Sequence, residues 1–220
     1  MRASFNTVAA FALAALLAWT HPAGANEYLT ADEPEAFIVQ LRDVSLEQLT
    51  DQSVAAEERR ARFQTLLNEG FDVEAVSSFV LAKYWRQASD NERQMFKTVF
   101  SDVLTARFLP VFDLYQDGMD LSVDRVSEAG GSGQVFDVFS TLKRPNEEPV
   151  KIAWRLLQRD GGNFKIVDVR VENLSMAITL RSEYTTQLQR NGGSVAGLID
   201  DLKQRLASGV VGDPKLTESN

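Results

Sequence analysis

The side chains that most often carry catalysis or bind zinc are nearly absent from this sequence. The 220 residues contain no cysteine, and the single histidine is His21. His21 lies in an N-terminal segment that we expect to be removed, so the remaining chain has neither imidazole nor thiol groups. This excludes Ser–His–Asp and Cys–His catalysis and zinc sites built from imidazole or thiolate. We therefore predict no enzyme, no catalytic residue, no metal ligand and no cofactor.

Two remaining side chains could take part in chemistry. Asp168 is flanked by Val167 and Val169 in an apolar stretch, and a buried carboxylate there could act as an acid or base. Because no histidine is available to assist it, we favour an Asp that is satisfied by hydrogen bonds. Ser175 precedes a helical pattern and has no base to activate it, so we predict that it caps that helix.

Arginine and aromatic side chains offer a further possibility, which is anion or ligand binding. Arg170 and Arg181 could bind phosphate oxygens through their forked guanidinium groups, or could be solvated or paired with acids. Tyr84, Trp85 and Arg86 could form the rim of a pocket or simply a packing cluster at a helix end. The sequence leaves these alternatives open.

The N-terminus has the pattern of a cleavable secretory signal. Arg2 is followed by an apolar run of about twelve residues at Val8–Trp19, and Ala23-Gly24-Ala25 provides a small-x-small cleavage site. A spanning helix needs about 20 residues, so a retained anchor is the less favoured alternative. We predict a signal peptide over 1–25 and an exported chain from 26 onward.

The charge balance excludes two classes of partner. The formal net charge is −8, with 23 Lys and Arg against 31 Asp and Glu, and loss of Arg2 makes it more negative still. Nucleic acids and anionic membranes both bind clustered positive charge. We therefore predict no nucleic-acid binding, and we expect any approach to a membrane to run through a partner protein.

The apolar periodicity divides the chain into a helical part, a sheet part and closing helices. Helical spacing predicts helices over 32–51 and 57–69, a short helix capped by Asp72, and a long helix from the capping box of Ser89 and Glu92. Pro110 should break this long helix. Its stripe contains four phenylalanines at positions 96, 100, 108 and 112, for which an ordinary packed core is the simplest interpretation.

From Met119 the period changes to two, which predicts strands. Four strands with short connections, near 119–124, 134–143, 150–159 and 164–172, indicate an antiparallel meander. Helices over 175–190 and after the cap Ser194 follow. We predict an α+β fold in one domain over 26–207, with a mainly helical part at 26–116, a curved four-stranded sheet at 117–173, closing helices at 174–207 and a disordered tail at 208–220.

The order of several motifs resembles that of the MlaC family, also called toluene- or organic-solvent-tolerance auxiliary proteins. The resemblance covers residues 32–207. No single motif is specific for the family by itself, and none is a catalytic signature. The matching segments are Phe79–Ser89 (FVLAKYWRQAS) with Glu92, Arg93 and Phe96, then Leu104, Phe108 and Tyr115–Gly118, then Gly162–Val169, Val171–Ser175 and Arg181–Tyr184, and finally Gly197–Leu202.

The resemblance implies a periplasmic carrier of phospholipid that belongs to an ABC-type lipid transport system. Its partners would be an inner-membrane ABC lipid permease complex and an outer-membrane lipoprotein complex. Its fold would be a cone-shaped sheet of the nuclear-transport-factor-two-like type, with acyl chains between sheet and helices, and we expect a monomer. The chain departs from the family pattern at Ala82 and Asn173, where glycine is usual, and at Phe164, where tryptophan is usual.

On this basis the apolar helical and sheet faces would stay apart and form a lipid cavity, whereas in an ordinary core they would pack together. Related sequences occur with hopanoid systems, so a hopanoid or another envelope lipid is an alternative cargo. A small enzyme on the same scaffold is a further alternative, and it would need a polar cavity. The predicted lipid-binding residues are Val76, Phe79, Val80, Tyr84, Phe96, Val99, Phe100, Val103, Phe108, Phe112, Leu121, Val138, Ile152, Trp154, Ile166 and Met176.

Overall fold

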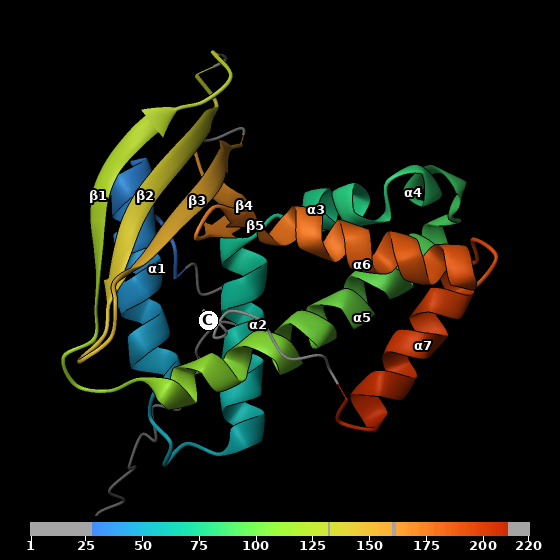
Figure 1. Cartoon of the computed structure of the whole chain (residues 1–220), viewed down its shortest axis with the longest axis horizontal. Helices are drawn as coiled ribbons and strands as arrows, with labels where there is room; N and C mark the ends of the chain where they lie inside the picture. Colours follow the sequence, from blue (N-terminus) through green and yellow to red (C-terminus); the bar gives the residue numbers. More distant parts are fainter. Residues whose placement is uncertain (1–27, 132, 160–161, 211–220) are drawn as a thin grey trace, which may run out of the picture.

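The computed structural model describes residues 28–131, 133–159 and 162–210. The predicted signal peptide and most of the predicted tail lie outside these ranges. The sheet forms one side of the molecule, with α1 and α2 beside it and the other helices extending away from it (Figure 1). The fold is α+β, as predicted from the change of apolar period along the chain.

Six of the helices match predicted segments, whereas the short helix α4 was not predicted. Among the described residues, the helices are α1 Pro34–Leu49, α2 Ala56–Gly70, α3 Val73–Leu81, α4 Lys83–Gln87, α5 Asp90–Phe108, the 3₁₀ helix η1 Leu109–Leu114, α6 Met176–Arg190 and α7 Val195–Ala207.

Local capping chemistry sets several of these boundaries. The Asp72 carboxylate accepts a hydrogen bond from the Ala75 N–H at 2.8 Å. Ser89 and Glu92 form the predicted capping box of α5, with the Ser89 N–H donating to the Glu92 carboxylate at 2.8 Å. Because Pro110 has no backbone N–H to donate, α5 ends at Phe108 and continues as the 3₁₀ helix η1.

The sheet is an antiparallel meander with the order β1-β2-β3-β4-β5. Its strands are β1 Asp120–Glu128, β2 Val135–Lys143, β3 Val150–Gln158, β4 Phe164–Val171 and β5 Leu174–Ser175. We predicted four strands, and the sheet has five, because β5 was not predicted. The chain turns tightly at Glu172 and Asn173, both at positive φ, so that β5 pairs with β4 before α6 begins.

A register shift in β4 changes which of its side chains face the helices. Ile166 lies opposite Leu156 and Asp168 lies opposite Arg155, which leaves Val167 as an extra residue in β4. Such a bulge offsets the alternation of side chains by one position. Val169 consequently joins Ile166 in the apolar cluster on the inner face.

The apolar residues form two separate clusters, not the single core in which a helix would pack directly on the sheet. One cluster belongs to the helices and is centred on Phe96, Phe100 and Tyr184, whose rings lie 5.4 to 6.0 Å apart. The other joins α1 to the sheet around Phe37 and Phe164, whose ring centroids are 6.0 Å apart. The space between the two clusters is where the candidate site lies.

An ion-pair cluster extends across β2, β3 and β4. The Asp137 carboxylate accepts two hydrogen bonds from Arg155, both at 2.9 Å, and it also pairs with Arg170 at 2.9 Å. Burial by itself opposes ionisation of Asp137, but the hydrogen bonds from the two arginines outweigh it, so the pKa of this carboxyl lies below its ordinary value. Arg170 is thus paired with an acid, one of the two predicted alternatives.

Candidate functional site

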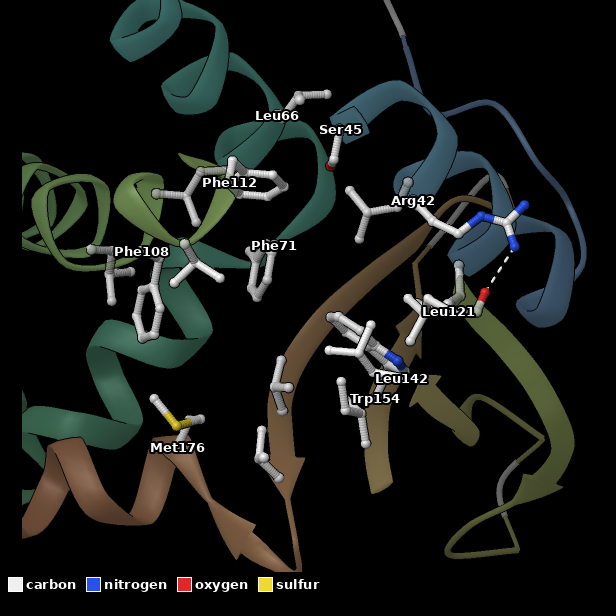
Figure 2. A pocket seen from close by; sticks show the side chains of 18 of the residues that line it. Arg42, Ser45, Leu66, Phe71, Phe108, Phe112, Leu121, Leu142, Trp154 and Met176 are labelled. Atoms are coloured by element: carbon white, nitrogen blue, oxygen red, sulfur yellow. Dashed lines mark hydrogen bonds between the residues drawn. The ribbon is translucent and has the colours of Figure 1, made fainter. Parts of the chain in front are cut away.

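An apolar cavity of about 410 Å³ lies between the sheet and the helices. Figure 2 shows Phe108 and Phe112 on its helical side, and Leu121, Leu142 and Trp154 on the sheet side, all directed toward the same space. The volume falls within the range of roughly 300 to 1,000 Å³ that is usual for small-molecule sites.

The helical wall comes from α1, α2, α3, α5, η1 and α6. Most of their lining residues are apolar, and Phe71 after α2 adds to this wall. The helical lining residues are Ile38, Leu41, Arg42, Ser45, Leu46, Leu49, Phe63, Leu66, Leu67, Phe71, Val76, Leu104, Phe108, Val111, Phe112, Met176, Ala177 and Leu180.

The sheet wall comes from β1 to β4 and from the segment that leads into β1. Valine, leucine and isoleucine predominate, and β4 contributes more residues than a regular strand could because of its bulge. The lining residues of this wall are Tyr115, Met119, Asp120, Leu121, Leu142, Ile152, Trp154, Val167, Asp168, Val169 and Val171.

The indole of Trp154 is held in place on the sheet wall by a hydrogen bond. Its Nε1–H donates to the Ser140 hydroxyl at 2.8 Å, and Ser140 is buried in β2. A buried indole N–H without a partner would be costly, so this bond allows a large aromatic surface to line the cavity.

Two of the three charged lining residues, Arg42 and Asp168, are hydrogen-bonded to other protein groups. Arg42 donates to the Leu121 carbonyl oxygen at 2.8 Å and to the Asp43 carboxylate at 2.7 Å. The Asp43 hydrogen bond raises the pKa of the Arg42 guanidinium. The Asp168 carboxylate accepts from the Ala177 N–H at 3.0 Å, which is the structural role predicted for it. The cavity wall is therefore largely hydrocarbon, with Arg42 and Asp168 held by protein groups, and it is suited to bind an apolar ligand.

Ser175 is the other residue that the sequence offered as a candidate for chemistry. The Ser175 hydroxyl accepts from the Ile178 N–H at 3.1 Å and caps α6, as predicted. Burial raises the pKa of the Tyr184 hydroxyl, which keeps it protonated among phenylalanines. Within the described ranges, no cluster of Asp, Glu, His or Cys is arranged to hold a metal ion. No helix in the same ranges is long and apolar enough to cross a membrane.

The structure brings one group of the predicted lipid-binding residues together around this cavity. They come from α3, the end of α5, η1, the strands β1 and β3, and the start of α6, segments that are far apart in the sequence. This group is Val76, Phe108, Phe112, Leu121, Ile152, Trp154 and Met176.

The remaining predicted residues lie away from the cavity lining. Most belong to the helical cluster, because the first turns of α5 face α3, α6 and α7 rather than the sheet. Val138 and Ile166 pack against α1 in the sheet cluster, and Phe79 is 41% exposed on the outside. Those in the helical cluster are Val80, Tyr84, Phe96, Val99, Phe100 and Val103.

Sequence reasoning missed the contribution of α1, α2 and the end of β4. Leu41 and Leu46 of α1 and Phe63 of α2 have the same helical spacing as ordinary core residues, so nothing in the sequence distinguishes a cavity wall from a packed face. Val169 and Val171 reach the cavity because of the bulge at Val167. No single-sequence signal locates such a bulge.

Two comparisons with known proteins give matches. The sequence profile of the MlaC protein family matches residues 39–204. The fold is similar to that of a phospholipid-binding protein from Ralstonia solanacearum, whose structure was solved in complex with a phospholipid. The two chains are 18% identical, with a TM-score of 0.68, and the alignment covers 80% of this chain and 97% of the other. No curated protein sequence matches significantly.

Proposed function

This chain belongs to the MlaC family, and from that premise we propose that it is a non-enzymatic carrier that holds the acyl chains of a phospholipid in its apolar cavity. The observation that carries the proposal is the composition of the cavity wall, which is mostly hydrocarbon and aromatic and contains only a few polar residues. The similar protein from Ralstonia solanacearum, whose structure contains a phospholipid, supports the same cargo.

The energetics favour lipid tails over any polar ligand. Each methylene group removed from water is worth about 0.8 kcal/mol, so an acyl chain gains affinity along its whole buried length. A charged headgroup would lose hydration inside the cavity and would find few free partners there. We infer that the acyl tails enter the cavity and the headgroup stays at its opening. The sheet and helices around the cavity would form a fold of the nuclear-transport-factor-two-like type.

The carrier would act in the periplasm after removal of the signal peptide over 1–25. It would move lipid between an outer-membrane lipoprotein complex and an inner-membrane ABC lipid permease complex, as a monomer with one lipid-binding domain over 26–207. The net charge of −8 supports delivery through protein partners, because an acidic surface is repelled by anionic bilayers. The absence of disulfide-forming cysteines leaves burial of the two apolar clusters as the source of stability.

A hopanoid or another envelope lipid remains the alternative cargo within the same class, because the wall selects for hydrocarbon without specifying its shape. The enzyme alternative requires carboxylates and hydroxyls that point freely into the cavity. Asp168 is instead hydrogen-bonded to the start of α6 and Arg42 to the Asp43 carboxylate, an arrangement that favours binding over catalysis.

The decisive experiment is native mass spectrometry of the protein purified from cells, followed by lipid extraction and mass analysis. We expect an added mass equal to a phospholipid. Leu142→Trp places an indole in the cavity and should abolish the added mass, whereas Leu174→Trp, at a position 69% exposed, should retain it. A bare polypeptide mass for the unmodified chain in repeated gentle preparations would refute the proposal, and a hopanoid mass would select the alternative cargo.

A further inference from the structure

A second pocket lies at the end of the helical part that is remote from the sheet. It has a volume of about 340 Å³ and is formed by the end of α3, the turn into α4, and α6. In Figure 1 this corner carries the labels α3 and α4, well away from β1 and β2. The pocket shares no lining residue with the lipid cavity. Its lining residues are Ser78, Phe79, Ala82, Lys83, Trp85, Arg86 and Arg181.

The pocket is cationic on an otherwise acidic protein. Lys83, Arg86 and Arg181 line it and are exposed, and it has no acidic lining residue. Within the described part of the chain, none of the three forms an ion pair with a carboxylate. The Lys83 ammonium lies 5.0 Å from the Tyr84 ring and the Arg181 guanidinium lies 4.9 Å from the Phe79 ring. The positive charge therefore remains available to a ligand.

The neighbouring acids are already paired with other cations. Glu74 of α3 binds Lys97 at 3.1 Å, and Glu183 of α6 binds Arg107 at 3.3 Å. These two are the acidic residues of α3 and α6. Their pairing elsewhere leaves the three cations of the pocket without a local counter-charge.

Aromatic side chains complete the pocket. Phe79 is 41% exposed, although it is a large apolar residue. Arg93 holds Trp85 in place. Its guanidinium lies 5.7 Å from the Trp85 ring, and its Nε–H donates to the Trp85 carbonyl oxygen at 2.9 Å. Arginine and aromatic residues together are the side chains most enriched at the energetic centres of protein interfaces.

The turn that creates the pocket is strained. Ala82 ends α3 and precedes α4 with φ 53° and ψ −121°, a conformation that favours glycine. Strain of this kind persists where the surrounding structure holds it, commonly at functional sites. The strained turn brings the end of α3, with Phe79, and the start of α4, with Lys83 and Arg86, onto one pocket.

We propose that this pocket is the docking site for an acidic segment of a partner protein, with a carboxylate bound between the three cations and an apolar side chain packed on Phe79 and Trp85. The inference rests on the proposed carrier function in that it names where the carrier meets a partner. Carboxylate is the chemistry that best suits arginine forks flanked by a lysine.

A protein surface fits the pocket better than an anionic membrane does. Three basic residues attract an anionic lipid surface only weakly, and the net charge of −8 opposes the approach of the whole molecule. A concave site with two aromatic walls can instead enclose one side chain and desolvate it, which strengthens a charge-assisted hydrogen bond.

The test is selection of random twelve-residue peptides displayed on phage, with the lipid-loaded, full mature chain as bait. We expect the enriched peptides to combine acidic and apolar residues and to bind less tightly at high salt. The variant Lys83→Glu/Arg86→Glu/Arg181→Glu should weaken the binding of these peptides by about tenfold or more. The variant Phe79→Ala should weaken it without any change of charge.

The matched control is Lys143→Glu/Arg190→Glu/Lys203→Glu, which changes the net charge equally at exposed positions outside the pocket. It should bind the peptides within about twofold of the unmodified chain. Peptides that lack acidic residues, or equal losses in the two triple variants, would overturn the docking site. So would stronger, pocket-dependent binding to vesicles containing anionic phospholipid, which would assign the pocket to membranes. Bound lipid, measured by native mass spectrometry in both triple variants, separates this outcome from failure of the carrier function.

Discussion

The phenylalanine stripe of α5 and η1 should divide into two energetic classes, and a pair of substitutions tests this division. Phe100 is fully buried and lies 5.4 Å from the Phe96 ring and 5.9 Å from the Tyr184 ring. Phe112 is half-buried, lines the cavity, and has the Phe63 ring at 6.1 Å. The two side chains have the same chemistry but different surroundings.

The expected losses in stability follow from these surroundings. Phe100→Ala leaves a void in a closely packed cluster, which should lower the free energy of unfolding by about 3–5 kcal/mol. Phe112→Ala enlarges a space that already exists, so it should lower the free energy of unfolding of the lipid-free protein by only about 1 kcal/mol, mainly through the contact with Phe63. Chemical denaturation of both variants after removal of lipid measures the difference.

Lipid affinity should show the opposite order. If the Phe112 ring covers roughly two methylene groups of a bound tail, its loss costs about 1.6 kcal/mol, or about 15-fold in affinity. Phe100→Leu, which preserves most of the buried volume and so keeps the fold, should leave affinity within about twofold. Displacement of a fluorescent phospholipid provides the measurement. The reasoning is refuted if Phe112→Ala destabilises the lipid-free protein as much as Phe100→Ala does, or if Phe100→Leu weakens lipid binding as much as Phe112→Ala does.

Two further predictions concern stability outside the cavity. Ala82→Gly should raise the free energy of unfolding by about 1 kcal/mol, because it relieves a positive φ that disfavours alanine; Ala61→Gly, at an exposed position inside α2, is the control and should give no gain in thermal denaturation. Because the pKa of Asp137 is lowered in the folded state, its contribution is present above the ordinary Asp pKa of about 3.9 and is lost as the pH falls below it. Asp137→Asn should lower the free energy of unfolding by about 1–2 kcal/mol at pH 7, a small value because the side chains of Arg155 and Arg170 are partly exposed to solvent. The substitution should also flatten the dependence of stability on pH below about pH 4. An acid denaturation curve for Asp137→Asn that parallels that of the unmodified chain would contradict this account.

Local signals predicted the elements well because each depends on a few neighbouring residues. The capping residues Asp72, Ser89 and Ser194 and the helix-ending Pro110 act within one turn of the backbone, and all four occupy the predicted positions. The same holds for the strands, where alternation of apolar and polar residues reflects a half-buried surface. The short strand β5 was missed because two residues carry too little pattern to predict it.

The candidate site was predictable only in part. Phe108 and Phe112 line the cavity, whereas Phe96 and Phe100 of the same stripe pack among helices. Apolar spacing reports that a face is buried, but not whether its neighbour is another side chain or an open space.

The sequence by itself determined the order of helices and strands, the lack of histidine and cysteine chemistry after residue 25, and the resemblance to one family. The tertiary structure alone decided that the apolar residues form two clusters with a cavity between them, that the bulge at Val167 turns Val169 inward, and that Lys83, Arg86 and Arg181 meet at one pocket. The physical reason is the separation along the chain of the residues that determine each feature. Caps and periodicity act over a few residues, whereas a cavity and a charged pocket depend on how distant elements pack, which no local pattern specifies.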